Sequence, residues 1–348
     1  MLFELGIGVA IAAVTSLIAC RALIASGPLD VPVHDRHEHD EPTPTAGGVG
    51  VSVGFGIALV LLFVVSTHWR AEVAAPGVRL LLITAAYAYA FLVLGFLDDA
   101  RPLGPRLKIA VFIALALAAA WSIGPVIEMP VTERLVFDIA YPAALAGTAL
   151  WIFTFINSVN FMDGANGLAM GSMAIALFVL GAIAYTGGSP SGVALGACGA
   201  GALLGFLYWN FPRGKLFAGD AGALFIGTIG AVGSILVIHR TSLSPFVPPI
   251  LFFPLLADAL LTLAYRVASG HKVLEGHSEH IYQIGLRAGW SHTRVAIAYW
   301  IAMAACGVIG FTVAQLGGAA PPVALAVLAL ISLLIAVWAR RHVLKTGI

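Results

Sequence analysis

The chain has 348 residues, a formal net charge of +1, 60% hydrophobic residues and only 10% charged residues. Soluble domains carry about 25% charged residues, so the composition excludes an ordinary soluble enzyme. No basic run indicates a nucleic-acid partner, and the three cysteines stand in apolar stretches without CxxC spacing, which argues against a disulfide framework and a zinc site.

Apolar stretches of roughly 20 residues recur along the whole chain, which is the length that an α-helix needs to cross a bilayer core. The sequence therefore predicts an all-α, polytopic integral membrane protein with about eleven transmembrane helices, forming one transmembrane domain over residues 1–348. The expected spans cover residues 2–24, 49–67, 77–97, 108–124, 137–156, 169–186, 192–209, 221–239, 246–267, 293–316 and 320–339.

Basic residues predict the orientation of these spans. Of the 18 lysines and arginines, all but Arg70, Arg79, Arg134 and Arg240 fall in or beside loops that follow odd-numbered spans. Because positive residues are retained on the cytoplasmic side, these loops are expected to be cytoplasmic. The unusual acids, amides and histidines fall in the same loops, which predicts a site at the membrane surface.

The first polar segment, residues 30–48, is rich in histidine and acidic residues around His39 and ends in prolines and a double glycine. Taken alone, it is typical of a metal-buffering loop of a cation transporter. Its proline-rich exit instead favours an ordered loop that leads into a closely packed helix.

The third span ends in Asp98 and Asp99. Two carboxylates beside hydrocarbon require a cation or hydrogen bonds, and Mg²⁺ is commonly bound through one or two carboxylates plus phosphate oxygens. A helix end that reaches headgroup water is the alternative interpretation.

The segment NSVNFMDGANGL follows the fifth span, and its Asn157, Asn160 and Asp163 recur at a helical spacing that predicts one polar face. The glycines that follow permit a turn or a close approach to a ligand. Amides and a carboxylate at such a bend suit a sugar or a nucleotide, and Asn166 belongs to the same candidate set.

A basic loop, NFPRGKLFAGDAG, leads into the eighth span, whose start carries Asp220. Helix N-termini favour anions, so Asp220 either caps this helix, binds a metal, or does both. Lys215 either contacts phosphate groups or reflects the cytoplasmic side of the loop.

Two further features lie near the ninth span. Asp258, Thr262 and Arg266 recur at i, i+4 and i+8, which favours an ion pair or a polar strip within the bundle. The later loop contains His277 and His280, whose spacing suits phosphate contact better than a zinc site of HExxH type.

Together, GFLDD, NSVNFMDGANGL, LFAGDAG and HSEHIYQ resemble the motifs of the polyprenyl-phosphate N-acetylhexosamine-1-phosphate transferases, over nearly the whole chain. The resemblance implies transfer of an N-acetylhexosamine-1-phosphate from a UDP-sugar to undecaprenyl or another polyprenyl phosphate, with release of UMP. It also implies Mg²⁺ as cofactor, with Mn²⁺ as an alternative, and a bacterial inner-membrane protein with its active site facing the cytoplasm.

Carried over to this sequence, the resemblance implies three groups of residues. The catalytic group is Asp98, Asp99, Asp220, His277 and His280, of which Asp220, Asp99 and Asp98 are the metal ligands. The substrate-binding group is Asn157, Asn160, Asp163, Asn166, Asn210, Lys215, Phe217 and His39, with Asn210 and Phe217 near the uridine.

Two departures from the family pattern bear on specificity. A third acid after Asp98 and Asp99 is absent, and the HSEHIYQ loop is not the triple-histidine version of the peptidoglycan branch. The loop favours an enzyme that initiates a surface glycan, such as an O-antigen, over phospho-N-acetylmuramoyl-pentapeptide transferase, which stays an alternative together with a divalent-cation transporter. The sugar is not specified, and a homodimer is left open because lipid-facing and partner-facing surfaces look alike.

Overall fold

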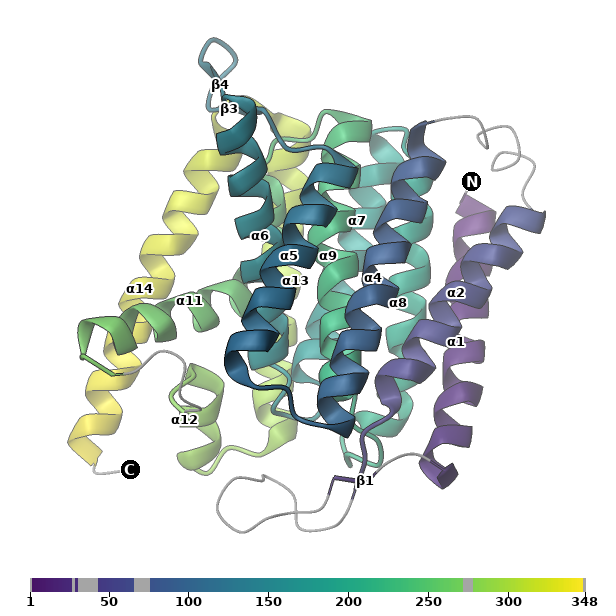
Figure 1. Ribbon diagram of the computed structural model, residues 1–348. Helices are drawn as coiled ribbons and strands as arrows, with labels where there is room; N and C mark the ends of the chain where they lie inside the picture. Colours follow the sequence, from purple (N-terminus) through teal and green to yellow (C-terminus); the bar gives the residue numbers. More distant parts are fainter. Residues whose placement is uncertain (1, 27–28, 31–42, 66–75, 272–277, 347–348) are drawn as a thin grey trace.

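The computed structural model describes residues 2–26, 29–30, 43–65, 76–271 and 278–346. Within these ranges the chain is a bundle of long helices with two short strand pairs (Figure 1). The helices are α1 (Leu2–Ser26), α2 (Gly47–Val65), α4 (Pro76–Ala100), α5 (Pro105–Ile123), α6 (Tyr141–Phe161), α7 (Leu168–Thr186), α8 (Pro190–Asn210), α9 (Gly219–Thr241), α10 (Val247–Leu251), α11 (Phe253–Ala268), α12 (Ile281–Arg287), α13 (His292–Leu316) and α14 (Ala320–Thr346).

Ten of these helices are long and apolar enough to cross a membrane, counted over the described residues. They are α1, α2, α4 to α9, α13 and α14, and they overlap the expected spans other than the ninth. The prediction of an all-α, multi-pass membrane protein is confirmed, whereas the exact number of crossings stays a prediction.

The ninth expected span, residues 246–267, is instead divided into α10 and α11 at Phe252. Pro254 explains the break, because it has no N–H for a bond to the carbonyl of Ile250 and its ring clashes with that turn. The 16 residues of α11 make a helix of about 24 Å, shorter than the hydrocarbon core of about 30 Å. It runs obliquely towards α14 (Figure 1).

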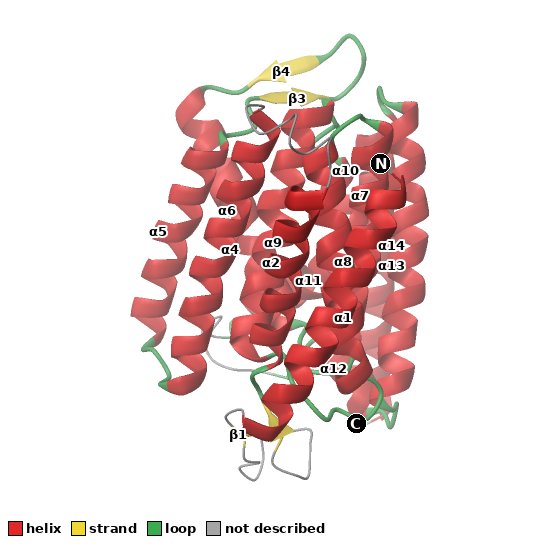
Figure 2. Cartoon of the chain, turned by 90° about the vertical axis from the view of Figure 1, so that its right-hand side faces the viewer, coloured by secondary structure: helices red, strands yellow, loops and turns green. Residues whose placement is uncertain are grey.

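The strand pairs lie at opposite ends of the bundle (Figure 2). Strands β1 (Leu29–Asp30) and β2 (Thr43–Pro44) are antiparallel and precede α2. Strands β3 (Glu128–Pro130) and β4 (Val136–Asp138) form an antiparallel hairpin between α5 and α6. The first pair lies at the same end as α12, and the loops predicted to share one side of the membrane gather there.

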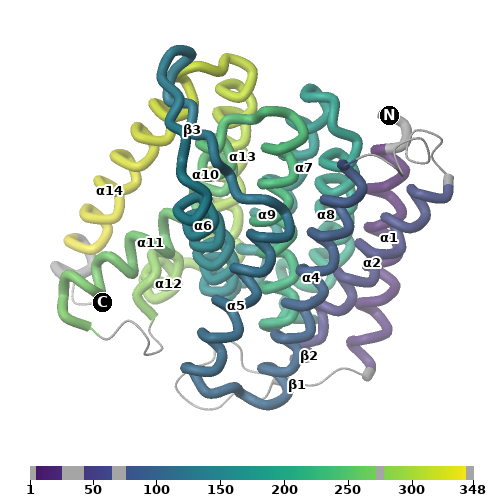
Figure 3. Tube along the Cα trace, turned by 45° about the horizontal axis from the view of Figure 1, so that its top comes forward, coloured from purple at the N-terminus to yellow at the C-terminus, as the bar shows by residue number. Residues whose placement is uncertain are grey.

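Helix α9 is the centre of the bundle and contacts α2, α4, α5, α6, α7 and α8 (Figure 3). Every residue from Ala221 to Val237 is buried, as expected for a helix that is apolar all round. Small residues allow its neighbours to approach: a Cβ on Gly48 of α2 would lie 2.2 Å from the Gly222 nitrogen. A Cβ on Gly95 of α4 would lie 2.5 Å from the Ala221 nitrogen. Such contacts are typical of helix packing in membranes.

We expect Gly48→Ala to separate α2 from α9, because the added methyl group would meet backbone atoms of Gly222 that no rotamer change can move. Overpacking of this kind costs about 1–3 kcal/mol of unfolding free energy, which thermal unfolding of the detergent-solubilised protein would detect. Gly147→Ala in α6 is the matched control, since open space surrounds that glycine. Equal stability of the two variants would contradict the close contact.

Candidate active site at the start of the central helix

Backbone hydrogen bonds connect the segment before α9 to the start of α2. Gly47 N donates to Phe217 O at 2.9 Å, Gly48 N donates to Ala218 O at 3.0 Å, and Phe217 N donates to Pro44 O at 2.8 Å. The loop that contains LFAGDAG is thereby held against the glycine pair that opens α2. The Phe217 backbone has a structural role, and the proposed uridine contact of its ring stays a prediction.

Gly219 begins α9 with a φ of +69°, a conformation that favours glycine. A Cβ at this position would lie 2.6 Å from Thr45 O and 2.7 Å from the Asp99 Oδ2. Glycine is therefore required here for two reasons, its backbone angle and the close approach of α4. The next residue, Asp220, lies in the first turn of the buried central helix.

Asp99 caps α9 from the neighbouring helix α4. Its Oδ1 accepts from Asp220 N at 3.1 Å, and its Oδ2 accepts from Ala221 N at 3.2 Å. These N–H groups belong to the first turn of α9, where no carbonyl within the helix can accept them, and where the helix dipole favours a negative group. Asp99 therefore fixes the start of α9; its role as a metal ligand stays a prediction.

Lys108 of α5 joins two of the predicted acids. Its Nζ lies 2.5 Å from Asp98 Oδ2 and 2.7 Å from Asp220 Oδ2. The other Asp98 oxygen accepts from Leu103 N at 2.7 Å. These side chains are only 12–29% exposed, so solvent screens the attraction less than at an open surface. The ammonium group is thus a fixed cation between two carboxylates.

Asn160 completes the contacts of Asp220, because its Nδ2 donates to Asp220 Oδ1 at 2.9 Å. The predicted polar face is only partly formed: α6 ends at Phe161, so Asp163 lies in the turn that follows the helix. Asn157 donates instead to Phe153 O within α6, at 2.7 Å. The glycine-containing segment after Phe161 explains why the helical spacing does not continue.

Asp163 shares the electrostatic environment of this cluster. Burial raises the pKa of its carboxyl group well above the ordinary value, and the nearby carboxylates of Asp220 and Asp99 raise this pKa further. Four acids therefore gather near one lysine. A cation bound here would favour the ionised form of these acids.

Two predicted amides bind the chain itself. The Asn210 Oδ1 accepts from Gly167 N at 2.6 Å and its Nδ2 donates to Leu216 O at 2.9 Å. The Asn166 Nδ2 donates to Pro212 O at 3.3 Å. Both side chains thus connect the turn after α6 with the loop before α9. Lys215 in that loop is exposed, and the substrate contacts of all three stay predictions.

The residues just before α12 lie beside the end of α6. His280 is 3% exposed, its Nδ1 lies 3.4 Å from Asp258 Oδ1, and its ring lies beside Phe161. Asp258 and Arg266 thus take part in the buried polar strip that the i, i+4, i+8 spacing favoured. His39 and His277 lie outside the described residues.

Sequence reasoning did not assign Lys108 to the site. Its position near a helix start was explained by the positive-inside pattern, which applies equally to a lysine with no other role. One signal was available: Lys108 follows Asp98 by ten residues across a short loop, a separation that permits antiparallel α4 and α5 to bring them together.

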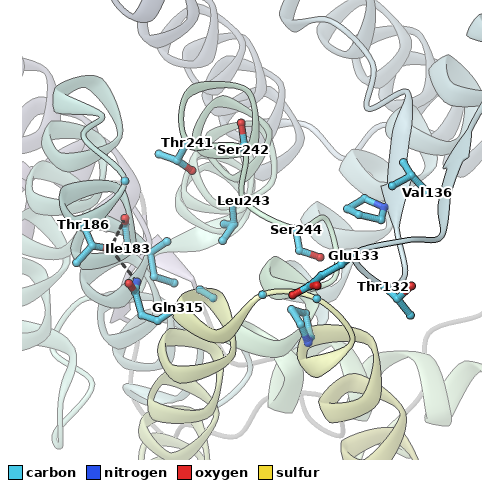
Figure 4. Close-up of a pocket in the computed structure, with 16 residues that line it drawn as sticks. Thr132, Glu133, Val136, Ile183, Thr186, Thr241, Ser242, Leu243, Ser244 and Gln315 are labelled. Carbon is cyan, nitrogen blue, oxygen red and sulfur yellow. Dashed lines mark hydrogen bonds between the residues drawn. The ribbon is translucent and has the colours of Figure 1, made fainter.

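A separate cavity of about 360 Å³ lies at the opposite end of the bundle, beneath the β3–β4 hairpin (Figure 4). Glu133, Thr186, Ser242 and Gln315 are among its lining residues, and Gln315 Nε2 donates to Thr186 Oγ1 at 2.9 Å. None of the predicted site residues lines it, so it is distinct from the candidate site.

Comparison with known proteins places part of this sequence beside one family. Residues 79–238, which include the acid pair, Lys108, the turn after α6 and Asp220, match the family model for glycosyl transferase family 4. Over these residues, a little under half of its length, the chain is similar to glycosyl transferase family 4. The resemblance drawn from the motifs is thereby confirmed.

Three relatives illustrate the range of proteins to which the chain is similar. A probable undecaprenyl-phosphate N-acetylglucosaminyl 1-phosphate transferase of Bacillus subtilis is 29% identical, over 66% of each chain. A phospho-N-acetylmuramoyl-pentapeptide-transferase of Moorella thermoacetica is 29% identical, over 72% of this chain and 83% of the relative. A decaprenyl-phosphate N-acetylglucosaminephosphotransferase of Mycobacterium tuberculosis is 32% identical, over 62% of this chain and 59% of the relative.

Removal of the Asp99 cap tests the geometry of the site without an activity assay. We expect Asp99→Ala to lower the unfolding free energy by about 0.5–2 kcal/mol, because two N–H groups of α9 lose their acceptors. Thermal unfolding in detergent measures the loss. Asp138→Ala in the exposed strand β4 is the matched control, and an equal effect of the two substitutions would contradict the cap.

Proposed function

We propose that this protein transfers an N-acetylhexosamine-1-phosphate from a UDP-sugar to a polyprenyl phosphate, with release of UMP, as the first membrane step of a surface glycan. The arrangement of Lys108 between Asp98 and Asp220, at one end of a membrane bundle, carries the proposal. The names of the Bacillus and Mycobacterium relatives combine a polyprenyl phosphate with N-acetylglucosamine phosphate transfer, which supports it.

In the proposed reaction, an oxygen of the lipid phosphate attacks the β-phosphorus of the UDP-sugar. The bond between the β-phosphorus and the bridging oxygen breaks, and UMP leaves with that oxygen. Phosphoryl transfer depends mainly on positioning and on neutralisation of charge, both of which the fixed ammonium of Lys108 provides.

A general base is not required, because the second pKa of a phosphate monoester is about 6 and the group is already largely dianionic at neutral pH. The contacts of Asp98 agree with this, since Lys108 and the Leu103 N–H occupy its two oxygens. We assign Asp98 to the orientation of Lys108 towards the lipid phosphate. Asn160, Asp163 and His280 lie on the side that we assign to the nucleotide-sugar.

Magnesium fits the chemistry of this site. Within the described ranges, no three Cys, His, Asp or Glu side chains are arranged as a ready metal-binding group. Mg²⁺, however, usually takes one or two carboxylates and completes its shell with water and substrate phosphates. Asp220, whose side chain is 29% exposed, would hold the ion, with Asp99 or Asp98 as a further ligand, and Mn²⁺ is the alternative. When bound, the ion supplies neutralisation of the negative phosphate oxygens.

We place the protein in the bacterial inner membrane with this site facing the cytoplasm. Most of its lysines and arginines lie in loops at the end of the bundle that carries the site, which supports that orientation. A nucleotide-sugar is charged and stays on the cytoplasmic side of the membrane, so the proposed orientation gives the site access to this substrate.

Phospho-N-acetylmuramoyl-pentapeptide transfer is a second candidate, since the Moorella relative is matched over 83% of its length. The histidine loop HSEHIYQ argues against it, because it is not the triple-histidine version. The divalent-cation transporter has no comparable support, because the family match is to transferases.

The purified protein is expected to release UMP from at least one UDP-N-acetylhexosamine in a panel that includes the muramoyl-pentapeptide derivative, when undecaprenyl phosphate is present. Chelation with EDTA should abolish release and excess Mg²⁺ should restore it. Asp220→Asn should lower the rate at least about 100-fold, since it weakens both metal binding and the Lys108 pair. Asp138→Asn at the far end is the control; full activity of Asp220→Asn would overturn the assignment.

Lys108→Met keeps an unbranched side chain but removes the ammonium group. We expect kcat to fall about 100-fold or more, as for removal of one fixed group that stabilises charge in a transition state. Lys108→Arg, which keeps the charge, should retain more activity than Lys108→Met. Arg134→Met, at an exposed position near the β3–β4 hairpin, controls for the loss of a positive charge. Activity of Lys108→Met equal to this control would refute the role.

A further inference from the structure

Asp258 is a buried carboxylate that the proposed reaction does not use. It is 2% exposed, in the middle of α11, where an ionised group is costly unless hydrogen bonds and charges compensate for lost water. Its Oδ1 accepts from Ile281 N at 2.8 Å and from Thr262 Oγ1 at 3.2 Å. Its Oδ2 accepts from Tyr299 Oη at 2.5 Å and from Tyr282 N at 3.2 Å.

These donors come from three different helices. Thr262 belongs to α11 itself, Tyr299 belongs to α13, and the two N–H groups belong to the first turn of α12. One carboxylate therefore fixes the start of α12 against α11 and α13. The same carboxylate lies 3.4 Å from Nδ1 of His280, the residue that immediately precedes α12.

The start of α12 in turn contacts the turn after α6. The Tyr282 hydroxyl donates to Phe161 O at 3.2 Å. A Cβ on Gly164 would lie only 2.2 Å from that hydroxyl oxygen, so the two segments are in direct contact. Asp163 lies between Phe161 and Gly164 in the chain. A displacement of α12 would therefore alter the position of the segment that carries Asp163.

Helix α11 makes a second contact with the residues just before α12. Arg266 lies two turns after Asp258 on the same buried face, and its Nη1 is 3.0 Å from Glu279 Oε2. Between them, Thr262 accepts from Arg340 Nη2 of α14 at 2.9 Å. The polar face of α11 thus connects the histidine loop to the C-terminal helices.

We propose that Asp258 is a positioning residue of the transferase site: it holds His280 and the start of α12 against the turn containing Asp163, so that they form one surface for the nucleotide-sugar. This assignment rests on the proposed function of the site. Asp258 does not touch the reacting groups. The contacts described for Lys108 and Asp98, on the side assigned to the lipid phosphate, do not include Asp258, so loss of Asp258 should affect one substrate more than the other.

Asp258→Asn tests the assignment, because it keeps the volume and one acceptor oxygen but removes the charge and the second acceptor. We expect KM for the UDP-sugar to rise about tenfold and KM for polyprenyl phosphate to stay within about twofold, as for loss of binding to one substrate. Tyr299→Phe removes one donor and leaves the carboxylate, so a smaller rise in the same KM is expected. If Asp258→Asn does not fold, Tyr299→Phe tests the same assignment.

A second measurement does not require activity. Diethyl pyrocarbonate modification, followed by mass spectrometry, should be slow at His280 in the native protein, because this ring is 3% exposed, and faster in Asp258→Asn. The exposed His271 should react in every variant, and Asp138→Asn should behave as the native protein.

The outcomes separate this assignment from the proposed function. Native UDP-sugar KM and native His280 reactivity in Asp258→Asn would overturn the role of Asp258 while the transferase activity stands. Equal changes in both KM values would also overturn it, because they would indicate general damage. Absence of UMP release from the native protein would refute the proposed function, and the His280 reactivity would still decide whether Asp258 holds this histidine.

Discussion

The carboxylates of Asp98, Asp99 and Asp220 gather near the start of α9, and neighbouring like charges repel unless a cation or hydrogen bonds compensate. Lys108 supplies the cation for Asp98 and Asp220, and the free N–H groups of α9 supply the hydrogen bonds for Asp99. An ammonium group and backbone N–H groups thus both offset the repulsion between these carboxylates. Because α9 is also the buried centre of the bundle, its starting residue is placed by the packing of six other helices.

The protein combines a rigid centre with a histidine loop held from the side. Small residues let α2, α4 and α9 approach to backbone contact, so the acids of α4 and α9 are fixed by helix packing. The histidine loop is fixed differently, by hydrogen bonds and ion pairs from the polar face of α11. The end of α6 connects the two, because Asn160 donates to Asp220 of α9 and the Phe161 carbonyl accepts from the Tyr282 hydroxyl of α12.

Much of this arrangement could be predicted because membrane helices have strong sequence signals. Apolar length predicted the helices, and polar residues at their ends predicted that Asp98, Asp99 and Asp220 lie at one end. The division of the ninth span was missed, although Pro254 is a local signal, because hydropathy averages over the whole segment.

The contacts of individual side chains were less predictable. Asn210 has the chemistry of a nucleotide-binding residue, yet both of its polar atoms bind the backbone of adjacent loops. The partners of Lys108 are 10 and 112 residues away, and only the packing of α4, α5 and α9 brings both to its ammonium group. Sequence spacing contains no such information when the partners lie on different helices.

That difference in separation has a consequence for the order in which the protein is assembled. Asp98 and Lys108 are neighbours as soon as α4 and α5 have been synthesised, so the lysine has a counterion early in membrane insertion. Asp220 is added three long helices later and enters beside a pair that already exists. Asp98 and Lys108 thus neutralise each other's charge at the ends of α4 and α5 until α9 has been synthesised.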